Sequence, residues 1–226
     1  NDVAVSGDYA YLADDTAGLR VVGITWSPFA LDCGVGSLAL SGPAKGVAVS
    51  GATAYVAADT AGLQAVDITD PANPALSDSF DMVGRAFAVA ISGAAAYVAD
   101  DSGGLRVVEV TANPAPVIVG HAATAGNAEA VAVKDSVAYV ADGSGGLRAF
   151  DVSNVTVPSE LWDCDGAIQA MDVAVDDAGL YAYVADWNGK LEVLQITGAT
   201  TVVCDVGDCT IAGGHPNGVA LAGSRA

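Results

Sequence analysis

One segment recurs five times along this chain of 226 residues and constrains the fold more than any other feature. It reads GVAVSGATAYVAADTAGLQAVDIT from Gly46 to Thr69, and close copies occupy residues 2–25, 88–111, 130–153 and 172–197. A tyrosine marks the same place in every copy, at successive spacings of 44, 42, 42 and 44 residues: Tyr11, Tyr55, Tyr97, Tyr139 and Tyr183. Such a period predicts a repeat architecture, in which each unit buries its faces against its neighbours.

Each repeat contains four short apolar runs separated by turn residues. In the second copy they are Val47–Val49, Ala54–Ala57, Leu63–Thr69 and a looser run at Pro74–Leu76. Short runs rich in Val, Ile and Tyr and bounded by Gly, Asp and Pro are typical of β-strands. Four antiparallel strands per repeat, here called A to D, predict an all-β chain folded as a β-propeller of four-stranded blades. The alternatives are a β-solenoid, whose coils are usually shorter, and a pair of β-sandwiches, which do not repeat so regularly.

The repeat follows the pattern V-A-V-S-G-x-x-A-Y-V-A-D-x-x-x-G-L-R-V-V-D-V-[ST]-x-P-x-x-P over nearly the whole chain. The match is closest in the second, third and fourth copies. This pattern resembles the LVIVD repeat of bacterial and archaeal propeller proteins. The resemblance implies a secreted or cell-surface propeller, and it carries no shared catalytic residues to assign to positions of this chain.

The two ends of the chain both read as strand A of a repeat. The first strand begins at Asp2, and the segment from His215 to Gly223 resembles another strand A. We therefore expect one propeller domain over residues 1–226, with five complete blades and the first strand of a sixth. The expected repeats are 2–45, 46–86, 87–128, 129–170 and 171–216, with 217–226 starting another. The simpler interpretation is a piece of a longer protein, and the alternative is a five-bladed ring with a redundant strand.

The charge of the chain restricts its partners. It carries 27 acidic and 8 basic residues, for a net charge of −19 and a pI near 4.1. This balance argues against binding nucleic acid or anionic lipid, both of which need Lys and Arg, and favours divalent cations or basic partners. The composition is 52% hydrophobic, but no apolar run reaches the ~18–20 residues needed to cross a bilayer, so we expect no membrane insertion.

Acidic turns between strands B and C recur and are candidates for calcium binding. Each is followed within four residues by a glycine, and the turns are expected to share one face of the propeller. Ca²⁺ needs several oxygen ligands, and no other cofactor is expected. The alternative is structural, because Asp can hold its own turn while Gly supplies positive φ. An arginine six residues after three of the aspartates suggests ion pairs across the hairpin. The candidate ligands are Asp14, Asp15, Asp59, Asp100, Asp101, Asp142 and Asp186.

The fifth repeat departs most from the others. Its B–C turn contains Trp187, Asn188 and Lys190, which place a large aromatic ring on a turn expected to be exposed. Such a ring suits contact with carbohydrate or protein, so these three residues are the candidate ligand-binding residues. The alternative is that Trp187 folds back over the neighbouring blade. Neither histidine has a partner at a spacing that suggests a catalytic triad.

The chain has four cysteines, and two of them are close in sequence. Cys204 and Cys209 are a candidate disulfide that would staple a local loop. Cys33 and Cys164 are expected near the outer strands of blades that splay apart, which argues against bridges between neighbouring blades. They are expected to be buried thiols or to link subunits.

These features together favour a non-catalytic propeller scaffold, extracellular or at the cell surface, with the periplasm as another location. It would bind a protein or a glycan through the face that carries the B–C turns. One alternative is a structural subunit of a surface assembly or filament, which would self-associate. Another is a secreted enzyme whose active site lies at the mouth of the propeller channel, marked by polar residues that do not repeat.

Overall fold

The computed structural model describes residues 1–226 except 27–28, 112–116, 165–167, 199–200, 212–213 and 222–226. The described residues form β-strands and contain no helix capable of spanning a membrane. The strands form five four-stranded sheets, each built from consecutive strands of the chain. All neighbouring strands within the sheets are antiparallel, as the turn-bounded apolar runs of each repeat predict.

The first sheet contains β1 (Asp2–Ser6), β2 (Tyr9–Ala13), β3 (Leu19–Trp26) and β4 (Phe29–Leu38). The second contains β5 (Gly46–Ser50), β6 (Thr53–Ala57), β7 (Leu63–Asp67) and β8 (Ala75–Phe80). The third contains β9 (Ala88–Ser92), β10 (Ala95–Ala99), β11 (Leu105–Glu109) and β12 (Val117–Ala122). The fourth contains β13 (Ala130–Lys134), β14 (Val137–Ala141), β15 (Leu147–Asp151) and β16 (Ser159–Cys164). The fifth contains β17 (Ala170–Val175), β18 (Tyr181–Asp186), β19 (Lys190–Gly198) and β20 (Thr201–Thr210).

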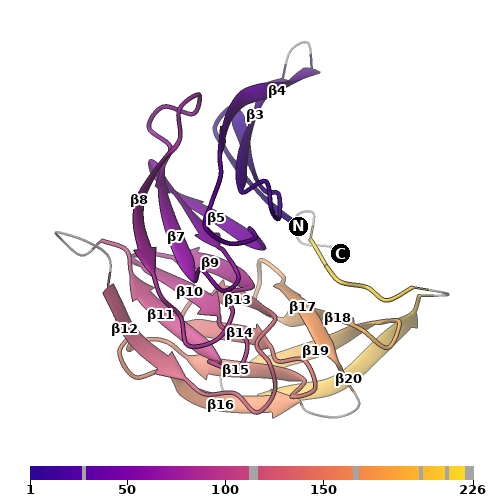
Figure 1. The fold of residues 1–226 in the computed structure, drawn as a ribbon. Coiled ribbons are helices and arrows are strands. Elements are labelled where there is room, and N and C mark those ends of the chain that lie inside the picture. Colours follow the sequence, from indigo (N-terminus) through magenta and orange to yellow (C-terminus); the bar gives the residue numbers. More distant parts are fainter. Residues whose placement is uncertain (27–28, 112–116, 165–167, 199–200, 212–213, 222–226) are drawn as a thin grey trace.

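The five sheets are blades arranged around a common centre (Figure 1). The innermost strands β1, β5, β9, β13 and β17 lie next to one another in that order. This arrangement confirms the predicted β-propeller with five complete blades. Figure 1 shows the ring open between the first and fifth blades, where the C-terminal segment runs from β20 toward the first blade.

The hydrophobic core lies in layers between neighbouring blades. We call the side of a blade that points to the next blade its front face and the other side its back face. Alternate residues of a strand point to opposite faces, so a blade with two neighbours is apolar on both. Between the first and second blades, Leu19 and Val21 on one front face pack with Val56 and Val66 on the next back face. All four are fully buried, and equivalent positions build the other three layers.

The B–C turn of each of the first four blades is joined to the link that leads from its strand D to the next blade. In the first blade the amide of Asp15 donates to the carbonyl oxygen of Ala44 at 3.1 Å, and the amide of Ala44 donates back at 2.9 Å. Asp15 takes a left-handed φ of 45°, and Gly18 in the same turn has φ 80°. Equivalent bridges join Asp59 to Ala86, Asp101 to Ala128 and Gly143 to Ala170. The B–C turns and the D–A links therefore form one face of the propeller, which we call the turn face.

One disulfide joins two neighbouring blades. Cys164 at the end of β16 is bonded to Cys204 in β20, and their Cα atoms are 5.9 Å apart. The predicted Cys204–Cys209 pair is wrong, and Cys209 is free and exposed. Both residues lie in the extended strand β20, where five residues span about 16 Å, far beyond the reach of a disulfide. The outer strands β16 and β20 are close enough for the bond, contrary to the expected splay.

Candidate functional site

The aspartates that end strand B bind the backbone of the D–A link on the turn face. Asp100 accepts hydrogen bonds from the amides of Val83 at 3.1 Å and Gly84 at 3.0 Å. In the next blade, Asp142 accepts from the amide of Gly126 at 2.7 Å. In the fifth blade, Asp186 accepts from the amide of Gln169 at 2.9 Å. These three carboxylates are almost fully buried, and each fixes the link that enters its own blade.

Ion pairs complete these turns. The predicted hairpin pairs are present, from Arg20 to Asp14 at 3.2 Å, Arg106 to Asp100 at 3.1 Å and Arg148 to Asp142 at 3.0 Å. Asp15 pairs with Lys45 at 2.9 Å, and Asp59 accepts two hydrogen bonds from Arg85, both at 2.6 Å. The Arg85 guanidinium lowers the pKa of Asp59. Burial raises the pKa of Asp100 more than its hydrogen bonds to Arg106 and the link backbone lower it.

The structure distributes the candidate calcium ligands over the blades. Each of Asp14, Asp15, Asp59, Asp100 and Asp142 has a basic side chain as partner, whereas Asp186 binds backbone and an amide side chain. Asp101 is joined through its backbone to Ala128. Within the described ranges, no three His, Cys, Asp or Glu side chains are grouped closely enough to hold a metal ion. These contacts agree with the structural interpretation of the turns, and calcium binding stays a prediction.

Trp187 is exposed on the turn face, with 40% of its surface accessible. The ring of His215 stacks on it, with centroids 4.6 Å apart and planes tilted by 16°. His215 Nδ1 lies 2.6 Å from the carbonyl oxygen of Trp187, and since a carbonyl can only accept, Nδ1 is the donor. The amide of Trp187 donates to Gln169 at 2.9 Å. Trp187 is therefore a fixed, exposed aromatic platform.

The other two candidate ligand-binding residues have partners within their own blade. The backbone amide and the side-chain amide of Asn188 both donate to Asp186, at 3.0 Å and 3.1 Å. Lys190 Nζ lies 2.6 Å from Asp208 and 3.5 Å from Glu192. These contacts shape the turn that presents Trp187, and a direct role of Asn188 and Lys190 in ligand contact stays a prediction.

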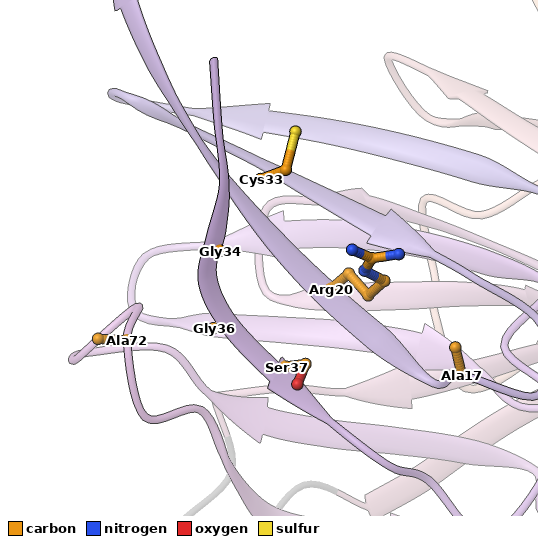
Figure 2. Close-up of a pocket in the computed structure, with 7 residues that line it drawn as sticks. All are labelled: Ala17, Arg20, Cys33, Gly34, Gly36, Ser37 and Ala72. Carbon is orange, nitrogen blue, oxygen red and sulfur yellow. The ribbon is translucent and has the colours of Figure 1, made fainter.

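A pocket of about 540 Å³ lies at the outer edge of the first two blades. Figure 2 shows its lining, which comes from the first B–C turn, β3, β4 and the β7–β8 link: Ala17, Arg20, Cys33, Gly34, Gly36, Ser37 and Ala72. Cys33 is free and exposed, so the expectation that it is a buried thiol is wrong. Cys164 is disulfide-bonded and is not available to link subunits. Because Arg20 is already paired with Asp14, this pocket is a weaker candidate than the turn face.

A second pocket, of about 320 Å³, lies at the mouth of the central channel. It is lined by the residue two positions before the common Val-Ala-Val/Ile run of each strand A, and in the five blades this residue is different each time: Asn1, Lys45, Phe87, Glu129 and Met171. Asn217 occupies the equivalent place ahead of the C-terminal segment. The surrounding V-A-V strands are nearly invariant, so variation at this position alone is typical of a site placed on a repeated scaffold.

Burial shapes the electrostatics of this mouth. It raises the pKa of Glu129, and the nearby carboxylates of Asp101 and Asp142 raise it further. Burial also raises the pKa of Asp172, although that carboxylate accepts hydrogen bonds from two backbone amides. Arg85 lies 5.0 Å from the centroid of the Phe87 ring. The sequence interpretation missed these residues as site candidates, and the signal that could have found them is the variable position in the aligned repeats.

Solved structures with this fold share little sequence with the chain. The periplasmic gluconolactonase of Pseudomonas aeruginosa is 16% identical, with a TM-score of 0.77 over 95% of this chain and 70% of that one. The computationally designed Ika8 protein is 13% identical, with a TM-score of 0.65 over 87% of this chain and 58% of that one. Sqt1 from Chaetomium thermophilum is 19% identical, with a TM-score of 0.67 over 86% and 54%. The chain thus spans little more than half the length of two of these structures, and the likeness shows the fold alone.

No curated protein matches the chain in sequence. The LVIVD repeat, in contrast, matches five times, over residues 1–27, 41–82, 83–124, 125–166 and 168–200. These matches cover most of the chain and follow the five blades in order. The chain therefore belongs to the LVIVD-repeat family.

Proposed function

We propose that this propeller is a non-catalytic recognition protein, extracellular or at the cell surface, that binds a protein or carbohydrate through its turn face. The observation that carries the proposal is the exposed Trp187 ring stacked on His215. An aromatic ring that is already fixed offers a large apolar surface and loses little conformational entropy on binding. It is the kind of anchor on which binding surfaces depend most.

The aromatic pair adjoins the channel mouth, which supplies the polar part of the proposed surface. His215 is two residues from Asn217, and Trp187 is hydrogen-bonded to Gln169, two residues from Met171. Both Asn217 and Met171 line the mouth. A ligand that extends from the Trp187 ring into the mouth would meet Lys45 and Glu129 in its lining, whose charged groups suit the hydroxyls of a sugar or the polar side chains of a protein.

The proposed location follows from the disulfide. A bond between Cys164 and Cys204 persists in an oxidising compartment and is rare in the cytosol. The gluconolactonase with the same fold is periplasmic. Both points favour a compartment outside the cytoplasm.

The proposal is tested by screening the purified chain on arrays of glycans and of extracellular proteins, followed by titration of the hits. Trp187→Ala is expected to weaken binding by a factor of about 30, the loss typical of an anchor residue, and to leave the melting temperature unchanged. Leu76→Ala is the matched control, because Leu76 is also an exposed apolar residue, on the outer strand β8 (50% exposed, against 40% for Trp187). If hits bind Trp187→Ala and the native chain equally, Trp187 is not the anchor and the proposal fails.

A second candidate function is hydrolysis at the channel mouth. The observation that favours it is that two carboxyls with raised pKa, Glu129 and Asp172, line one pocket. A carboxyl with a raised pKa keeps its proton to a higher pH, as a general acid requires. Lactones are the substrates to test, because a gluconolactonase has this fold. Their hydrolysis is measured by the acid that it releases. Turnover lost in Glu129→Gln and kept in Glu160→Gln would support this function, and no turnover by the native chain would exclude lactones.

A further inference from the structure

The first and fifth blades each have one face that no other blade covers. On the back face of the first blade, Val3 is 56% exposed. The valines at the same position of the other blades are buried, with exposed fractions of 4%, 7%, 9% and 5%: Val47, Val89, Val131 and Val173. The same side chain in the same strand is therefore open to solvent in the first blade alone.

The front face of the fifth blade is likewise not covered by another blade. Its Tyr183, Leu191 and Val193 are only half-buried. The same residue types, Tyr11, Leu19 and Val21, form the front face of the first blade, where they are 3%, 0% and 0% exposed beneath the second blade. The open front face of the fifth blade thus has the composition of a face that, elsewhere in this ring, binds a blade.

The C-terminal segment lies where the first strand of a blade packed on that face would belong. The amide of Val219 donates to Asp172 Oδ2 at 2.8 Å, just as the amide of Val47 in strand A of the second blade donates to Asp2 Oδ2 at 2.9 Å. The sequences correspond, with NGVALAG from Asn217 matching KGVAVSG from Lys45. This segment lines the channel mouth together with the first residues of strand A of all five blades. Six segments of the strand A type therefore begin around one pocket.

We propose that these two open faces together bind one further four-stranded blade of this same repeat type, with residues 217–221 as its first strand. Residues 217–221 already occupy the position of strand A, next to the channel. The open faces of the first and fifth blades have the same residue types as the faces that pack together between the other blades. A second copy of the chain fits less well, because residues 217–221 lie where its first blade would have to dock.

The test completes the blade in the same chain. Residues 222–226 are replaced by a copy of residues 50–86, which supplies strands B, C and D. The extended chain is expected to stay monomeric, to melt at least about 5 °C higher and to bind far less of a dye that fluoresces on apolar surface. A second extended chain with residues 92–128 repeats the test with another donor repeat.

Val3→Asp is the matched probe of the layer itself. It is expected to change the melting temperature little in the 226-residue chain, where Val3 is exposed, and to lower it strongly in the extended chain, where the new blade buries it. Val47→Asp, at a buried site, should lower it in both. Equal melting of the native and both extended chains, failure of both to fold, or a dimer of the native chain that Val3→Asp dissociates would each overturn the proposal.

Discussion

Removing the disulfide between the fourth and fifth blades is expected to lower the free energy of unfolding by about 4 kcal/mol. The bond between Cys164 and Cys204 closes a loop with a sequence separation of 40 residues. The chain-entropy relation gives about 13 cal/mol/K for a loop of this length, or about 4 kcal/mol at 25 °C. In a chain of this size such a loss lowers the melting temperature by about 8–16 °C.

The perturbation is the double substitution Cys164→Ala and Cys204→Ala. Alanine is preferred to serine because Cys164 is 3% exposed and packs in the layer between the fourth and fifth blades, where an unpaired hydroxyl would add its own penalty. Urea unfolding followed by tryptophan fluorescence measures the change in the free energy of unfolding. Cys33→Ala with Cys209→Ala is the control, and it should change this free energy little because both residues are exposed.

A thiol count checks the pairing independently. The unfolded, unreduced chain should react at two thiols, Cys33 and Cys209, and at four after reduction. Four reactive thiols before reduction would contradict the disulfide. A loss below about 1 kcal/mol in the double variant would refute the loop-entropy argument, and the full loss in the control pair would show that the wrong cysteines were paired.

Three further predictions concern charged groups. Asp142→Ala should cost about 1–3 kcal/mol, because it removes a buried carboxylate that accepts hydrogen bonds from Arg148 and from the amide of Gly126, whereas Asp14→Ala should cost less than about 1 kcal/mol because that pair is exposed; urea unfolding of both variants compares them. Burial raises the pKa of Glu129 above its ordinary value of 4.5, so the folded chain holds this proton more tightly and ionisation weakens the fold. Glu129→Gln should therefore raise the melting temperature at pH 7 and have no effect below pH 4.5, and an equal effect at both values would contradict this reasoning. Calcium binding by the acidic turns predicts a melting temperature that rises with Ca²⁺ and falls with chelator, and a curve indifferent to both would exclude it.

The blades could be predicted from the sequence because their determinants are local and are repeated five times. Tyr55 lies in the predicted strand B, and Gly62 has the left-handed φ of 71° that its turn position requires. The pair of Arg106 with Asp100 was expected from a spacing of six residues, which places the two side chains across one hairpin. Each of these contacts joins residues within a single turn or hairpin, where spacing in the sequence determines distance in space.

The parts that could not be predicted depend on contacts between distant segments. The Trp187–His215 stack joins residues 28 apart in the sequence, and the described part of the chain contains no second stack of this kind. The partner of Cys204 depends on the course of the long strand β20, whose hydrogen-bond register with β19 shifts twice. A pairing argument from sequence distance alone therefore chose the nearer cysteine, which an extended strand holds too far away.

The near identity of the four layers between blades has a consequence for how the chain folds. A front face that carries Tyr, Ala and Leu accepts the back face of any blade almost equally well, so a newly formed blade can dock on the wrong neighbour. Such misassembly is a characteristic kinetic trap of repeat proteins. Growth of the chain from its N-terminus limits the error, because each blade first meets its immediate predecessor. The disulfide between Cys164 and Cys204 then joins the fourth and fifth blades covalently. It fixes the order of these two blades, whose packing faces would otherwise be interchangeable with those of the others.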